Sequence, residues 1–385
     1  MKPQSIVQKM NRENVSNCLK QIVSHQLLPM SEQFIKFRSD NFTEYIRTPW
    51  AGCRIAQTLK SGLGLALPSR IGESWEFSTS AELPSRCTGT FEGTFSDFLR
   101  NGKHSLQWLS DSHRKVWGNQ SPLLVKYIDA AENLSLQLHP PIETSCLSSF
   151  ESGKWESWLV LRHSSNSGIF LGLECGVSKE EFIDTIHYGG DVQSLLHFVP
   201  VHTGELYVIP PRTIHTLGAG VCVLEPQMMQ PGKKAVSLRL HDWNRKYDAH
   251  GNVSESCKPL ELHLEEALKF IDFDAPRGKE LEKLNRVEPI IILDNHEFRV
   301  VEFSLIPYLK AQVLSGTGTY FEEPSHELEV ILAMQGHVCV TVDNVSYELS
   351  AGESAAIAAS AKQVILQCRK ANVYRAHCLP ALFSK

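Results

Sequence analysis

Several side chains capable of metal binding and acid–base chemistry lie in short apolar segments of this 385-residue chain. In residues 133–141 (NLSLQLHPP), Ser135, Gln137 and His139 alternate with leucines. A strand turns alternate side chains to opposite faces, so the segment predicts one apolar face and one polar face. Such a polar face is either exposed to solvent or turned into a polar cavity.

Two other segments carry further metal-capable side chains. Glu156 lies in the strand-like segment GKWESWLVL, and His215 lies in GELYVIPPRTIHTLGAG. A buried carboxylate must be paired or bound to a cation, because an isolated buried charge is too costly. Amide oxygens such as that of Gln137 are weak ligands, and one histidine among 16 is uninformative. A site therefore depends on these segments converging.

Two cations are predicted beside this group. Lys154 precedes Glu156 by two residues, so on a strand it shares that face. Arg239 alternates with Leu238 and Leu240 in VSLRLHDW, which places its charge opposite an apolar face. Cations that converge near a metal suit an anionic, phosphorylated substrate. The alternative is that each is a surface charge on a half-exposed strand.

The length of 385 residues predicts two domains, and the composition indicates an ordinary globular protein. Hydrophobic residues make up 42% and charged residues 21%. A net charge of −5 and the absence of basic runs predict neither nucleic acid nor a membrane as partner. The N-terminus has no apolar core of signal-peptide length, and the ten cysteines show no C-x-x-C pair. We therefore expect a cytoplasmic protein with reduced thiols.

The order of elements predicts a mainly β chain. Short apolar strands recur between Gly and Pro residues, which favours a sandwich or jelly roll. A weak helical pattern predicts a helical N-terminal extension over residues 1–40. Thr94 is the expected N-cap of one helix, and Ser178 with Glu181 forms the expected capping box of another. ELHLEEALKFID predicts a third helix, and a polar linker is expected near 272–289.

A resemblance to a known family follows from several motifs. Gly204, Pro210 and His215 have a spacing similar to the second half of a cupin motif, with Arg212 where that motif usually has glycine. The chain resembles the type I mannose-6-phosphate isomerases of the cupin superfamily, in their shorter bacterial form, from about residue 48 to the C-terminus. The motifs that carry the resemblance are IGESWEFS, PLLVKYIDAAENLSLQLHP, GKWESW, GELYVIPPRTIHTLGAGVCVLEPQ and SLRLHDWNR.

The resemblance implies one Zn²⁺ per chain and a set of site residues. The implied metal ligands are Gln137, His139, Glu156 and His215. The implied catalytic residues are Arg239, Lys154 and Glu225, and the implied substrate-binding residues are Ser135, Lys154 and Arg239. One departure is Pro141, which stands where the family usually has an acidic residue.

The resemblance also implies two cupin-type jelly-roll domains. Residues 41–288 would form the catalytic domain with its inserted helices, and residues 289–385 a smaller domain. In GESAAIAAS the smaller domain has alanine where a ligand histidine would stand. We therefore expect residues 289–385 to hold no metal, and no cluster of titratable side chains inside their β barrel.

The implied activity is interconversion of mannose 6-phosphate and fructose 6-phosphate through a cis-enediol. The general base stays open among Glu225, Lys154, a zinc-bound water and a histidine. The competing hypotheses are a metal-dependent cupin oxygenase and a non-catalytic protein that binds sugar phosphates. The expected partner is a small sugar phosphate, and the chain is expected to be a monomer or a homodimer.

Overall fold

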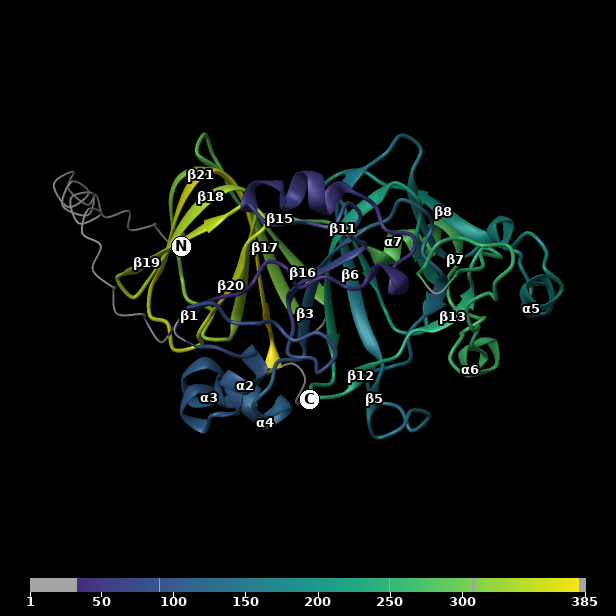
Figure 1. Ribbon diagram of the computed structural model, residues 1–385, viewed down its shortest axis with the longest axis horizontal. Coiled ribbons are helices and arrows are strands. Elements are labelled where there is room, and N and C mark those ends of the chain that lie inside the picture. Colours follow the sequence, from purple (N-terminus) through teal and green to yellow (C-terminus); the bar gives the residue numbers. More distant parts are fainter. Residues whose placement is uncertain (1–32, 90, 249, 307–308, 381–385) are drawn as a thin grey trace, which may run out of the picture.

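Strands dominate the computed structural model, which describes residues 33–380 except residues 90, 249 and 307–308. A six-stranded sheet lies in the middle, between a five-stranded sheet and the large C-terminal sheet (Figure 1). A short parallel pair joins β5 (Glu151–Ser152) to β12 (Lys234–Ala235). The prediction of a mainly β chain is confirmed.

The six-stranded sheet is covered on both faces. Its strand order is β14-β9-β6-β11-β3-β2, and all neighbouring strands are antiparallel. One face packs on the five-stranded sheet and the other on the C-terminal sheet. Its strands are β2 Glu73–Phe77, β3 Leu123–Asp129, β6 Lys154–His163, β9 Leu206–Ile209, β11 Val221–Met229 and β14 Arg286–Val287.

The five-stranded sheet has the order β13-β4-β10-β7-β8. Leu171 and Leu217 on its inner face pack against Trp158 of the six-stranded sheet. Its outer face is covered by α5 (Lys179–Tyr188) and α6 (Leu264–Leu268). Its strands are β4 Leu136–Leu138, β7 Gly168–Leu173, β8 Leu196–Pro200, β10 His215–Leu217 and β13 Leu238–His241.

The alternating segment at 133–141 forms a shorter strand than expected. Leu136 and Leu138 pack in the outer core under the helices, while Gln137 faces the other way. Leu134 precedes the strand and belongs instead to the core between the two sheets. The prediction that all three leucines share one face is therefore wrong for Leu134, because alternation of faces holds only along the strand itself.

The C-terminal sheet has eight strands, in the order β1-β20-β18-β21-β17-β16-β15, with β19 paired to β18. Its first strand comes from the expected helical extension, so residues 34–36 are strand and not helix. Residues 37–40 are not helical either, and residues 1–32 of that prediction lie outside the described residues. The strands are β1 Phe34–Lys36, β15 Ile290–Asp294, β16 Phe298–Ile306, β17 Leu309–Glu322, β18 Glu329–Val342, β19 Val345–Ser350, β20 Ser354–Ile357 and β21 Val364–Cys378.

The expected helix caps are confirmed. The Thr94 side chain accepts from the Asp97 amide at the start of α2, and Ser178 with Glu181 forms a capping box on α5. The region expected as a linker, near 272–289, contains the helix α7, which the sequence patterns had not predicted. The remaining helical elements are α2 Phe95–Arg100, α3 Gly102–Trp108, α4 Asp111–Trp117, α7 Gly278–Asn285, η2 Tyr45–Arg47, η3 Ile55–Leu59, η4 Ser61–Leu63 and η5 Val192–Leu195.

Helices in the described part of the chain are short. None of them combines the length and the apolar character needed to cross a bilayer.

Titratable side chains gather in the C-terminal sheet, against expectation. The Arg375 guanidinium lies 2.5 Å from Glu322 Oε2, and its Nε donates to Glu329 Oε1 at 2.7 Å. His377 lies 3.9 Å from the same Glu329. The expectation of no such cluster was wrong, because β17, β18 and β21 bring together charges that are far apart in the sequence.

Candidate metal centre

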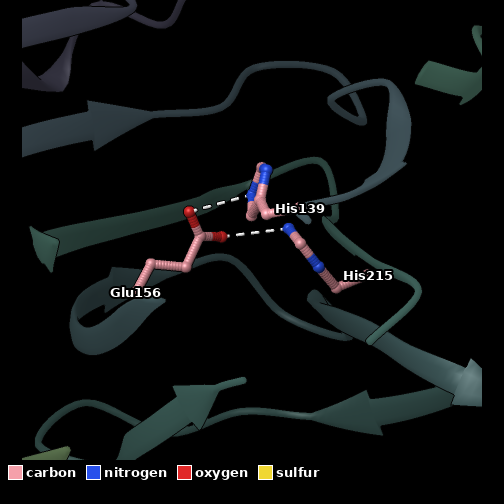
Figure 2. Close-up of side chains that lie close together, drawn as sticks. All are labelled: His139, Glu156 and His215. Atoms are coloured by element: carbon pink, nitrogen blue, oxygen red, sulfur yellow. Dashed lines mark ion pairs between the residues drawn. The ribbon is translucent and has the colours of Figure 1, made fainter. Parts of the chain in front are cut away.

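Three buried side chains converge between the two facing sheets. Glu156 Oε2 lies 3.1 Å from His139 Nε2, and Glu156 Oε1 lies 3.0 Å from His215 Nε2 (Figure 2). The ligand atoms of the three residues all lie within 4.8 Å of one another. Each of the three residues is at most 1% exposed, so the cluster lies in the protein interior, away from bulk solvent.

Strand register explains why these side chains meet. His215 on β10 stands directly opposite Gln137 on β4, and Arg239 on β13 stands opposite Gln137 from the other side. Residues directly opposite in an antiparallel pair share a face, so these three line the inner face of the five-stranded sheet. His139 follows β4 two residues after Gln137, and Glu156 reaches across from β6 in the six-stranded sheet.

The hydrogen bonds of the two imidazoles fix where their protons sit. His139 Nδ1 lies 3.2 Å from the Val236 carbonyl oxygen, and His215 Nδ1 lies 2.8 Å from the Thr213 carbonyl oxygen. A carbonyl oxygen can only accept, so each Nδ1 carries a hydrogen and donates it. In a neutral imidazole the Nε2 atom is then an unprotonated acceptor. Each Nε2 atom faces the carboxylate, and in a neutral ring it would point a lone pair at it.

The two histidine–carboxylate contacts would be ion pairs only if the imidazoles were protonated. Burial and the nearby Lys154 ammonium lower the pKa of His139 to about 3, so this ring is neutral at physiological pH. Among the described residues, neither Nε2 atom nor Glu156 Oε1 has a hydrogen-bond partner. Lone pairs that face one another in a buried space are satisfied by a cation, and two nitrogens with a carboxylate are typical donors for a divalent transition metal.

Lys154 completes the charge of this cluster. Its Nζ lies 3.1 Å from Glu156 Oε2, on the face that the strand spacing predicts. Burial alone would raise the pKa of the Glu156 carboxyl, but the neighbouring Lys154 ammonium lowers it and helps to hold that pKa well below its usual value. Gly153 lets β6 begin here, because a Cβ at this position would lie 1.9 Å from the Pro140 carbonyl oxygen.

Glu225 lies in the same sheet, with both carboxylate oxygens engaged. Oε1 accepts from the Trp158 indole at 2.9 Å, and Oε2 contacts Lys126 Nζ at 2.9 Å. Gln227 Nε2 also donates to Oε2, at 2.7 Å. Burial raises the pKa of Glu225 despite the Lys126 ammonium. The described contacts of Glu225 are thus with side chains of its own sheet.

Arg239 and Ser135 form a second group beside the three metal-capable residues. Arg239 Nε donates to Ser135 Oγ at 3.1 Å, and Ser135 Oγ donates to Asp242 Oδ1 at 2.6 Å. Arg239 Nη1 donates to the Glu261 carbonyl oxygen at 2.8 Å. The neighbours of Arg239 on β13 are buried leucines of the outer core, so the predicted alternation is confirmed.

A cavity of about 250 Å³ lies elsewhere, beside the turn at 210–214. Its lining includes Arg212 and Arg277 but none of the three converging side chains. Both guanidinium groups donate to backbone carbonyls, Arg212 to that of Phe270. We take the buried cluster, and not this cavity, as the candidate reaction site. The cluster brings metal-capable side chains together, whereas the size of a cavity alone provides no reactive group.

The chain is similar in sequence to known mannose-6-phosphate isomerases. No family model matches the chain. A mannose-6-phosphate isomerase from Streptococcus mutans is 28% identical over 288 residues, which cover 70% of this chain and 82% of that protein. The mannose-6-phosphate isomerase ManA of Bacillus subtilis is 27% identical over 285 residues, with the same two shares. The resemblance to mannose-6-phosphate isomerases is confirmed.

Solved structures of such isomerases share the fold. The mannose 6-phosphate isomerase from Bacillus subtilis aligns with a TM-score of 0.71 at 21% identity, over 90% of this chain and 99% of that one. A mutant of phosphomannose isomerase from Salmonella typhimurium aligns with a TM-score of 0.64 at 16% identity, over 90% and 99%. At these identities the likeness concerns the fold.

The sequence analysis did not identify three residues that lie at the candidate site. Gln227 lies opposite Glu156 and donates to it at 3.0 Å. Lys126 is a lysine within the fully buried strand β3, and that unusual placement was the available signal. Asp242 lies in SLRLHDWNR and is 4% exposed, but its partner Ser135 is 107 residues away and nothing local indicates the contact.

Proposed function

We propose that this chain is a zinc-dependent aldose–ketose isomerase that interconverts mannose 6-phosphate and fructose 6-phosphate. The observation that supports it most is the pair of buried Nε2 atoms of His139 and His215 that face the Glu156 carboxylate. A cation suits that arrangement, and the curated relatives described above are mannose-6-phosphate isomerases.

We assign Gln137, His139, Glu156 and His215 as the ligands of the metal. One carboxylate and three neutral ligands leave a divalent ion with net positive charge, and a catalytic zinc site keeps an open position for substrate or water. Bound there, Zn²⁺ would act as a Lewis acid toward the sugar oxygens. The carbonyl oxygens that hold each Nδ1–H fix the ring orientations, as partners of metal-bound histidines commonly do.

Arg239 is the residue that we assign to charge stabilisation. Moving a proton between C1 and C2 of the sugar creates negative charge on an enediolate oxygen, so the site must offer directed donors. The contacts to Ser135 and to the Glu261 carbonyl oxygen use two of the five N–H groups of Arg239. They support a guanidinium fixed at the edge of the metal cluster, with remaining donors for substrate.

We further propose that the two facing antiparallel sheets form a cupin-type jelly roll within residues 41–288, and that residues 289–385 form a second domain without a metal. The first of these proposals is supported by the candidate site, because its residues lie on the inner faces of both the five-stranded and the six-stranded sheet.

The proposed reaction can be tested with mannose 6-phosphate. Fructose 6-phosphate formation would be coupled through glucose 6-phosphate to NADPH, and we expect a kcat of about 1 to 1,000 s⁻¹, as is typical of enzymes. Unphosphorylated mannose is the control substrate and should react far more slowly, because Lys154 and Arg239 are assigned to an anionic substrate.

The same preparation distinguishes the competing hypotheses. Oxygen uptake on addition of a substrate, without fructose 6-phosphate, would indicate an oxygenase. Binding of mannose 6-phosphate without turnover by the metal-loaded protein would indicate a non-catalytic binder. Either result would contradict the proposed function.

A further inference from the structure

A row of buried polar side chains crosses the inner face of the six-stranded sheet beside the metal cluster. It begins at Glu156 on β6, continues through Gln227 and Glu225 on β11, and ends at Lys126 on β3. These four side chains are at most 6% exposed. Their order alternates acid, amide, acid and base, so each acceptor meets a donor.

Gln227 is the link between the two acids. Its Nε2 donates to Glu156 Oε2 at 3.0 Å and to Glu225 Oε2 at 2.7 Å. A primary amide has two N–H groups, so both are used. The backbone fixes this arrangement, because Gln227 stands directly opposite Glu156 and two residues from Glu225 along the same strand face.

Glu225 is in turn anchored from two directions. Trp158 Nε1 donates to its Oε1 at 2.9 Å, and Lys126 Nζ lies 2.9 Å from its Oε2. Lys126 also contacts Glu73 Oε1 at 3.0 Å, so the row is tied to β2 as well. The carboxylate therefore has little freedom, and it holds the amide of Gln227 in place.

We propose that Gln227 is a positioning residue that orients the Glu156 carboxylate toward the two imidazoles, and that Glu225 acts through Gln227. The inference rests on the proposed metal centre. Two buried carboxylates on neighbouring strands would repel each other, and a neutral amide that donates to both separates them. Groups that hydrogen-bond to a ligating carboxylate fix its geometry, and their loss typically weakens metal binding.

The test is the affinity of purified Gln227→Leu protein for Zn²⁺, measured by competition with a fluorescent chelator. Leucine removes both donors, and we expect an affinity about 10- to 100-fold weaker than that of the unchanged protein. Gln312→Leu is the matched control, because Gln312 Nε2 also donates to a glutamate, Glu302, at 3.0 Å but lies in the C-terminal sheet. The control should bind zinc like the unchanged protein.

Gln227→Met offers nearly the length of glutamine without donors, and it replaces Gln227→Leu if that variant does not fold. The visible spectrum of the Co²⁺-loaded protein gives a second readout, because it reports the geometry around the metal. Folded variants of Gln227 with unchanged zinc affinity and an unchanged Co²⁺ spectrum would overturn the inference.

Glu225→Gln tests whether Glu225 acts through Gln227. The new side chain keeps an oxygen that can accept from Gln227, so zinc affinity should stay within about threefold and kcat should fall much less than in a catalytic acid or base, whose loss costs about 100- to 10,000-fold. A collapse of kcat with metal retained would show that Glu225 acts on substrate directly and would contradict its positioning role.

These measurements separate the inference from the proposed function. If the unchanged protein binds zinc but does not isomerise mannose 6-phosphate, the function fails while the affinity loss in Gln227→Leu still supports the positioning role. If the unchanged protein binds no zinc, both fail. If isomerisation is confirmed and Gln227→Leu binds zinc normally, only the positioning role fails.

Discussion

Glu156→Gln is expected to abolish metal binding and to lower isomerase turnover by at least about a thousandfold, which corresponds to roughly 4 kcal/mol of lost transition-state stabilisation. Glu156 supplies the only negative charge among the three converging side chains, and it contacts both Nε2 atoms. With glutamine, the buried Lys154 ammonium loses its acidic partner and repels an incoming cation. Metal content by elemental analysis and kcat in the coupled assay measure both effects.

Glu174→Gln is the matched control for this substitution. Glu174 also contacts an imidazole, with its Oε1 2.9 Å from His197 Nδ1, but this pair lies beside Glu282 of α7 and not among the three converging residues. We expect its metal content and turnover to stay near those of the unchanged protein. If the Glu156→Gln protein still bound one metal per chain, Glu156 would not be a metal ligand.

Arg239→Lys is expected to lower kcat at least about a hundredfold while metal content stays unchanged, because lysine keeps the charge and loses the planar fork of donors. Arg239 is positioned by Ser135 and by the Glu261 carbonyl oxygen, and an ammonium cannot reproduce both contacts with the same geometry. An interaction made only in the transition state appears in kcat when it is lost.

The kinetic pattern decides which role Arg239 has. A raised KM with kcat nearly unchanged would show that it anchors the phosphate, and unchanged constants would show that it has no role in the reaction. Arg286→Lys serves as control, since Arg286 is likewise held by a protein oxygen, that of Glu205 at 2.8 Å, but lies on β14 of the six-stranded sheet. The control should leave both constants unchanged.

Local patterns in the sequence predicted the parts of the site that depend on a single strand. Glu156 and Lys154 share a face because they are two residues apart, and Arg239 alternates with buried leucines. The caps at Thr94 and Ser178 were predictable for the same reason, since a cap involves residues three apart. Such features need no knowledge of which strands pair.

Contacts between distant strands could not be predicted in this way. Gln227 meets Glu156 only because β11 pairs with β6 in one register. A shift by one residue would turn its side chain to the other face. The same reason explains the C-terminal cluster, where Arg375 meets Glu329 across β21 and β18. The resemblance implied metal ligands and catalytic residues, but it did not indicate which other side chains hydrogen-bond to these residues and fix their positions.

We propose that a metal held at His139, Glu156 and His215 is required for isomerisation. Its most direct test is a titration of chelator-treated, metal-free protein with Zn²⁺ while fructose 6-phosphate formation is followed. We expect no turnover without metal, and activity that rises in proportion to added zinc and levels off at about one equivalent per chain. Full turnover by the metal-free protein, or none with one equivalent of zinc bound, would contradict it.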